Sequence, residues 1–157
     1  MADYRARPLC ESDRDRIRAA MKFLPPDEVA LACPYFELRT WKKDAVLMKD
    51  GEAGDFMGII LSGQVAVRKE TSFPGKYTLV AVLDPGAMVG EISAVEKGLR
   101  SATVVAMGDV ELLTLDSAGL ERLLAERPPI GVKVLKRIVH VLSLRLRKAY
   151  DRLSSLL

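Results

Sequence analysis

The spacing of apolar residues changes twice along the chain, and each change predicts a different kind of structure. Over residues 12–23 apolar side chains recur at three- and four-residue steps, the period of an amphipathic helix, and Ser12 or Asp13 is placed to cap it. This helix stops at Pro25 and Pro26. A second, shorter helix is predicted through Val29–Ala32, with Asp27 as its cap, and it ends before Pro34. Residues 1–10 show no period and are expected to form a loose lead-in.

From Tyr35 the pattern becomes that of short strands. Turn-forming glycines recur every ten to twelve residues: Gly51, Gly63, Gly75, Gly86, Gly98 and Gly108. Between them lie runs rich in β-branched and apolar residues: Phe36–Trp41, Ala45–Met48, Phe56–Leu61, Gln64–Lys69, Tyr77–Leu83, Thr103–Met107 and Val110–Leu115. Strands at this spacing predict a mostly β fold with flanking helices, in the form of a sandwich or jelly roll.

The helical period returns at Asp116. Asp116 or Ser117 caps a helix that ends at Arg127, and Pro128 then starts a long helix with no interruption to Leu157. One apolar stripe on it has steps that average 3.5 residues, the coiled-coil period: Leu135, Ile138, Leu142, Leu146, Ala149, Leu153 and Leu156. A helix of about 30 residues is about 45 Å long. We therefore predict a homodimer through this stripe; the alternative is a helix packed only on its own domain.

Composition narrows the class of protein. The chain has 157 residues, 49% of them hydrophobic, which suits one domain with a sizeable core. No run reaches the roughly 18 apolar residues of a membrane helix, and the N-terminus is too charged for a signal peptide. Two cysteines, Cys10 and Cys33, make no disulfide framework. We expect a cytoplasmic protein that has no membrane contact.

The positive charge is concentrated at the C-terminus. Residues 128–157 carry seven Lys and Arg against one acid, while residues 23–127 carry eleven against sixteen. A basic helix can contact nucleic acid or an anionic membrane, but more often it presents the solvated face of a helix whose other face is buried. We favour the solvated face.

The chemistry is concentrated between Gly86 and Ala106. Arg100 offers a planar fork of donors for phosphate oxygens, and Glu91 is an acceptor suited to a sugar hydroxyl. Gly90 allows a close backbone approach, and a helical turn begun at Glu91 would aim free N–H groups at an anion. These features predict a site for a small phosphorylated ligand. Taken alone, Glu91 and Arg100 are equally compatible with a surface ion pair beside a turn.

The order of motifs resembles a known family. The segment at residues 90–103 reads GE…RSAT. Two further stretches accompany it: a glycine-acidic turn at residues 50–55 and an ILSGxVxV-like hairpin at residues 58–67. Together with the helices, they resemble the cyclic nucleotide-binding domain of catabolite activators, cyclic-nucleotide-dependent kinases and gated channels. The resemblance covers about residues 24–154 and divides the chain into a lead-in and helix (1–23), a jelly-roll domain (24–127) and a long C-terminal helix (128–157).

The resemblance implies a ligand and a site. The ligand is cyclic AMP or cyclic GMP, with no metal. Arg100 would hold the exocyclic phosphate oxygens and Glu91 would accept from the ribose 2′-hydroxyl. The remaining residues implied to line the sugar, phosphate and base are Gly90, Ile92, Ser93, Ser101 and Ala102.

Three departures from the family pattern affect this interpretation. Leu99 stands where the family often has proline. Ala149 and Tyr150 occupy the positions of the hydroxyl pair that contacts adenine in activators; Tyr150 could stack on a base or donate to it, so the base stays open. Activators also continue into a helix-turn-helix domain, whereas this sequence stops at Leu157, so we expect no direct contact with nucleic acid.

Enzymatic alternatives find little support. A metalloenzyme jelly roll needs several histidines, and this chain has only His140, which is expected to be a packing or interface residue. No serine or cysteine has triad partners. Two classes remain. The first is a regulatory sensor module whose C-terminal helix closes over a cyclic nucleotide and signals to an effector domain or protein. The second is a dimeric scaffold that needs no ligand.

Overall fold

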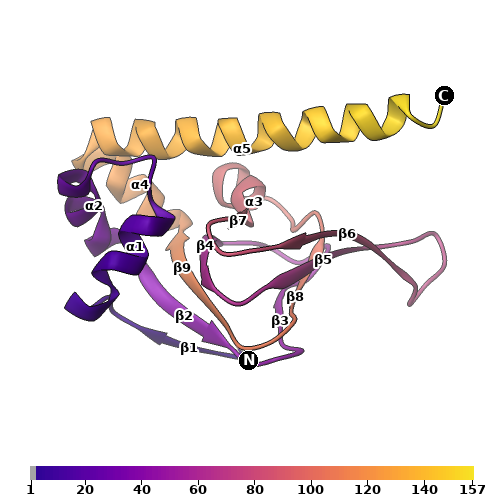
Figure 1. Ribbon diagram of the computed structural model, residues 1–157, viewed down its shortest axis with the longest axis horizontal. Helices are drawn as coiled ribbons and strands as arrows, with labels where there is room; N and C mark the ends of the chain where they lie inside the picture. Colours follow the sequence, from indigo (N-terminus) through magenta and orange to yellow (C-terminus); the bar gives the residue numbers. More distant parts are fainter. Residues whose placement is uncertain (1–2) are drawn as a thin grey trace.

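Two antiparallel sheets form the body of the protein in the computed structural model, which describes residues 3–157 (Figure 1). The five-stranded sheet has the order β1 (Tyr4–Arg7), β2 (Glu37–Trp41), β9 (Val110–Asp116), β4 (Phe56–Ser62) and β7 (Met88–Val89). The four-stranded sheet has the order β3 (Val46–Met48), β8 (Thr103–Ala106), β5 (Val65–Glu70) and β6 (Tyr77–Leu83). The predicted fold class, mostly β with flanking helices, is confirmed, and the predicted strands agree with the observed ones to within two residues.

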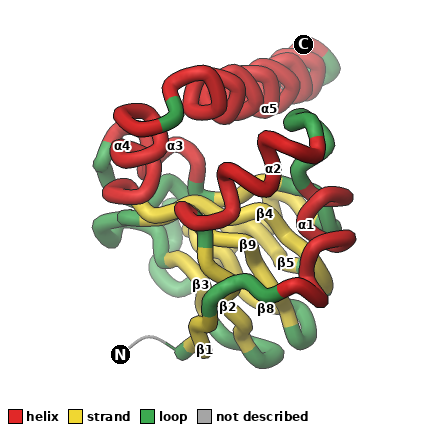
Figure 2. The backbone as a smooth tube through the Cα atoms, turned by 90° about the vertical axis from the view of Figure 1, so that its left-hand side faces the viewer, coloured by secondary structure: helices red, strands yellow, loops and turns green. Residues whose placement is uncertain are grey.

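The helices gather at one end and along one side of the sheets (Figures 1 and 2). They are the 3₁₀ turns η1 (Glu11–Asp13) and η2 (Cys33–Tyr35) and the α-helices α1 (Arg14–Ala20), α2 (Pro26–Ala32), α3 (Glu91–Glu96), α4 (Ser117–Glu126) and α5 (Pro128–Ser154). The long helix α5 runs the length of the molecule, and α3 lies beneath it (Figure 1). No helix within residues 3–157 is both long and apolar enough to cross a membrane.

The N-terminal segment differs from its prediction as a loose lead-in. Its first two residues lie outside the described range, but Tyr4–Arg7 pairs antiparallel with β2 and places Tyr4 opposite Trp41. The two rings lie 5.3 Å apart, and Arg7 donates to the buried carboxylate of Asp13 at 2.6 Å. Because a four-residue strand at a sheet edge is too short to show a period, the spacing of apolar residues could not reveal it.

The first two helices also begin and end elsewhere than predicted. The helix predicted over residues 12–23 is shorter, and α1 ends at Ala20. Asp27 does not cap α2; the extended backbone of Pro25 precedes the helix, and Pro26 is its first residue. Proline suits that place because its ring presets a helical φ and its missing N–H would have had no partner within the helix.

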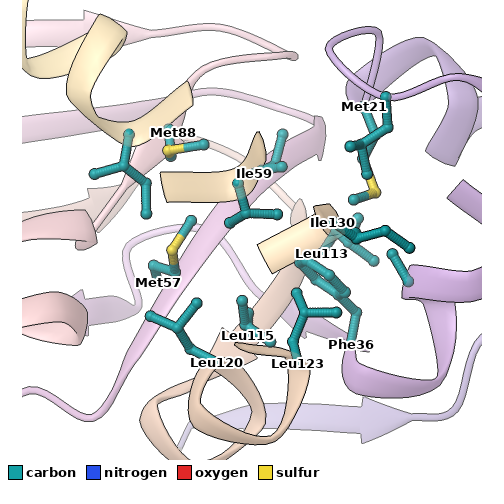
Figure 3. Packing of buried hydrophobic residues seen from close by; sticks show 14 of the residues in the cluster. Met21, Phe36, Met57, Ile59, Met88, Leu113, Leu115, Leu120, Leu123 and Ile130 are labelled. Carbon is teal, nitrogen blue, oxygen red and sulfur yellow. The ribbon is translucent and has the colours of Figure 1, made fainter. Parts of the chain in front are cut away.

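Two hydrophobic clusters hold these elements together. One lies between the two sheets and includes Trp41, Phe56 and Leu112. The other joins the five-stranded sheet to the helices, and Figure 3 shows Ile59 and Leu113 of the sheet with Ile130 of α5 and Met21, which follows α1. The first turns of α5 are therefore part of the domain core.

The apolar stripe of α5 does not face a single partner. Ile138 is buried in the domain core, and Leu135 and Leu142 pack against that core. The distal members Leu146 and Leu153 are 53% and 59% exposed. The prediction that Ile138 lies in a dimer seam is therefore wrong, because this residue is buried in the core of its own domain. Beyond Leu142, α5 contributes no residue to that core within residues 3–157, so the distal part of the stripe extends past the core and is exposed.

Candidate functional site

The segment from β7 to β8 forms one wall of a cavity. Gly90 follows β7 with φ +74°, a conformation that glycine adopts without strain, and α3 begins at the next residue. The predicted helical turn at Glu91 is thereby confirmed. A Cβ atom on Gly90 would lie 2.7 Å from Arg100 Nη1 and 2.6 Å from Met48 Cε. Glycine at this position therefore lets Arg100 approach the backbone.

Arg100 is a buried cation with few partners. The residue is 6% exposed, and its Nη1 donates to Ser93 Oγ at 2.6 Å and to the Gly90 carbonyl at 3.3 Å. Its guanidinium carbon lies 4.7 Å from the ring centre of Phe56. No carboxylate within residues 3–157 forms an ion pair with it, and burial lowers the pKa of its guanidinium. A buried guanidinium with donors to spare is suited to binding an anion.

Gly54 also belongs to the setting of Arg100. A Cβ atom on Gly54 would lie 2.5 Å from both Arg100 Nε and Ser93 Oγ. The sequence shows the glycine-acidic turn that contains Gly54 but indicates no role for this glycine at the site. The absence of a side chain here is what admits the arginine between two neighbouring segments.

Glu91 is buried as well, but its partner comes from α5. The Glu91 side chain is 4% exposed and forms an ion pair with Arg145, which also donates to the Met88 carbonyl. The two predicted ligand-binding side chains therefore do not pair with each other. The sequence did not single out Arg145. The available signal was its spacing of three residues from both Leu142 and Lys148, which places the three side chains on one face of the long helix.

These residues surround a cavity of about 710 Å³ between the four-stranded sheet, α3 and α5. Its lining brings together seven of the eight predicted site residues: Gly90, Glu91, Ile92, Ser93, Arg100, Ser101 and Ala102. The eighth, Tyr150, is 61% exposed and does not line the cavity, whereas Ala149 does. Because neighbouring helical residues point about 100° apart, Ala149 faces inward and Tyr150 faces away.

The rest of the lining was not predicted. β6 contributes apolar side chains including Val80 and Val82. Lys69 of β5 donates to the Ser101 carbonyl at 2.7 Å and pairs with Asp50 at 2.9 Å. Together with Arg145, α5 contributes two more basic residues, Lys148 and Arg152. The cavity thus has one basic, buried end at Arg100 and an apolar strand facing a basic helix.

A sequence comparison places this arrangement among known proteins. Residues 38–127, more than half of the chain, match the family described as "Cyclic nucleotide-binding domain". The "Cyclic AMP receptor protein" of Thermus thermophilus is 33% identical over 126 residues, which are 80% of this chain and 56% of that protein. A "CRP-like cAMP-activated global transcriptional regulator" of Mycobacterium tuberculosis is 26% identical and is covered over 57% of its length. The chain therefore spans just over half the length of these relatives.

Solved structures give the same result. A cyclic nucleotide-binding domain from Methylobacillus flagellatus superposes with a TM-score of 0.89 at 28% identity, covering 99% of this chain and 90% of that one. The catabolite activator protein of Thermus thermophilus gives 0.72 at 32% identity, over 85% and 60% of the two chains. The motifs, the fold and these matches agree: the chain belongs to the cyclic nucleotide-binding domain family.

Proposed function

We propose that this protein is a regulatory module that binds a 3′,5′-cyclic nucleotide, cyclic AMP or cyclic GMP, in the cavity beside α3. The observation that carries the proposal is the buried guanidinium of Arg100, which has no carboxylate partner in the described chain and lies in the same cavity as the buried carboxylate of Glu91. A ligand that carries both an anion and a hydroxyl group matches such a pair.

Each part of the ligand has a counterpart in the cavity. The cyclic phosphate accepts from Arg100, beside Ser101 and Ala102, and the ribose 2′-hydroxyl donates to Glu91. The backbone of Gly90, Ile92 and Ser93 follows the sugar and phosphate. The names of relatives support this ligand class, since they include a cyclic AMP receptor protein and a cGMP-dependent protein kinase.

The contact between Arg145 and Glu91 suggests how binding changes the protein. Arg145 on α5 donates to the carboxylate of Glu91, which is the group that the ribose hydroxyl would bind. It also donates to the Met88 carbonyl. In our proposal the ribose hydroxyl replaces Arg145 at Glu91, and the distal half of α5 moves to a new position over the ligand. The same helix can transmit the signal because ligand binding shifts the balance between two positions of one element.

The exposed face of α5 supplies a surface for the output. Its apolar residues recur at steps of four, three and four: Leu146, Tyr150, Leu153 and Leu157. We propose that this face forms a homodimer and passes the change to an effector domain or protein. Sedimentation analysis checks this. The wild type should sediment as a dimer and Leu153→Lys as a monomer, and a monomeric wild type at high concentration contradicts the dimer.

Thermal melting with cyclic nucleotides tests the binding proposal. A ligand at 100 times its dissociation constant should stabilise the folded protein by about 2.7 kcal/mol. We expect cyclic AMP or cyclic GMP to raise the melting temperature while 5′-AMP and 5′-GMP do so far less. If no cyclic nucleotide shifts the melting temperature at millimolar concentration, the binding proposal is wrong and the protein acts as a scaffold.

A further inference from the structure

The wall opposite β6 points to which base the cavity prefers, an inference that rests on the proposed function. With the phosphate at Arg100 and the ribose at Glu91, the parts of the cavity left for the base are the apolar strand β6, the helix α5 and side chains of β3, β5 and β8, which are apolar except for Lys69. Lys69 is bound to Asp50 and to the Ser101 carbonyl. Val80 and Val82 can pack against the flat face of a purine, as apolar side chains commonly do. The hydrogen-bonding groups at the edge of the base must then interact mainly with side chains of α5.

The polar groups on this side of the cavity are all donors. α5 lines the cavity with Arg145, Lys148 and Arg152, whose steps of three and four residues place them on one helix face. Arg145 is bound to Glu91, whereas Lys148 and Arg152 form no ion pair with any residue in the range 3–157. The other residues that α5 and β6 contribute to the lining are apolar: Val80, Ala81, Val82, Leu83, Leu142 and Ala149. This part of the cavity therefore offers no acceptor side chain.

Purines differ in the groups that would face such donors. Guanine presents two neighbouring acceptors, O6 and N7, and these are the atoms that Arg and Lys bind in the commonest specific contact with a base. Adenine presents the acceptor N7 beside the donor N6, which would face a cation without a partner. We propose that Lys148 and Arg152 are specificity-determining residues that make the site prefer a guanine cyclic nucleotide over cyclic AMP.

The preference has a predicted size. A good two-point contact of this kind discriminates by about 5- to 150-fold, and because Lys148 and Arg152 are exposed to water we expect the lower part of that range, about tenfold. Titration calorimetry on the 157-residue chain should therefore give a dissociation constant about ten times smaller for cyclic GMP than for cyclic AMP. Cyclic IMP has O6 and N7 but no 2-amino group, so it should bind like cyclic GMP.

Variants separate base reading from simple attraction of the phosphate. Glutamine suits adenine, whose N6 and N7 it can bind together, so the double variant Lys148→Gln, Arg152→Gln should abolish or reverse the preference for guanine. A role limited to phosphate attraction would weaken both nucleotides equally. Arg147→Gln is the matched control, because Arg147 lies beside Lys148 but is not part of the cavity lining. We expect it to leave the ratio unchanged.

Each remaining outcome is decisive. Cyclic AMP binding as tightly as cyclic GMP, or cyclic IMP behaving like cyclic AMP, overturns the role of Lys148 and Arg152 while leaving the proposed function standing. An unchanged ratio in the double variant overturns it as well. If no cyclic nucleotide binds to the wild type, the proposed function fails and this inference fails with it.

Discussion

The two ends of the cavity are built in different ways. The end that we propose binds the phosphate, here called the phosphate end, comes from eleven consecutive residues, Gly90–Arg100. Its charged residues Glu91 and Arg100 are 3% and 6% exposed. The α5 end comes from a helix that reaches Glu91 across 54 residues of sequence, and its basic side chains are half-buried or exposed. A buried, local end holds one geometry and can supply affinity. An exposed end on a separate helix can vary and move, so we propose that selectivity and signalling depend on it.

Removing the cation of the phosphate end should have the largest effect. Arg100→Met keeps much of the side-chain volume but removes the group that meets the phosphate. We expect affinity to fall by about 2–5 kcal/mol, or roughly 30- to several-thousand-fold. The melting temperature of the ligand-free protein should not fall, because the variant no longer buries a cation without a counter-charge. Calorimetry and thermal melting on the same sample test both statements, and unchanged affinity would show that the two ends do not divide the work in this way.

The geometry of the phosphate end can be tested with a pair of glycines. Gly90 and Gly75 both have positive φ, +74° and +78°, but a Cβ atom would meet Arg100 at Gly90 and nothing within 4 Å at Gly75. Both alanine variants should lose about 1–2 kcal/mol of stability from backbone strain. Only Gly90→Ala should also lose about tenfold in affinity, because its methyl group displaces the guanidinium. Equal affinities in the two variants would contradict this account.

The α5 end should respond in the opposite direction. Arg145→Gln removes the group that competes with the ribose for Glu91, so we expect affinity to rise by about three- to tenfold. The ligand-free protein should become less stable, because Glu91 is left buried without its cation. Hydrogen exchange in residues 142–154 of the wild type should change on ligand binding. Lower affinity in Arg145→Gln together with unchanged exchange would refute the proposed displacement.

A site remote from both ends provides the smallest expected effect on binding. The Arg7 guanidinium holds the pKa of Asp13 well below its usual range, so the folded protein binds a proton there less readily than the unfolded chain does. This stabilisation is complete above the unfolded pKa of about 3.9 and is lost as the pH falls further. Asp13→Asn should cost about 1–2 kcal/mol at pH 7 and progressively less below about pH 4, with unchanged ligand affinity. Denaturant unfolding at pH 7 and below about pH 4 tests the stability effect. Altered ligand affinity would mean that the pair of Arg7 and Asp13 is coupled to the cavity.

Most of the fold and of the phosphate end could be predicted because both depend on local pattern. Glycine spacing marked the strands, and the chemistry of Gly90, Glu91 and Arg100 lies within one short segment. The strand Tyr4–Arg7 escaped because four edge residues carry no period. Gly54 escaped because its role depends on Arg100 lying against it, which no neighbouring residue indicates.

The α5 end shows where sequence alone reaches its limit. The sequence determined that residues from Pro128 onward form a long helix with apolar and basic faces, since periodicity is local. It did not determine the rotation of that helix about its axis, which depends on how Ile130, Val134 and Ile138 pack into the core. That packing turns Ala149 inward and Tyr150 outward and brings Arg145 to Glu91. Only the tertiary structure decides which face of α5 lines the cavity, because a rotation of about 100° exchanges one residue for the next.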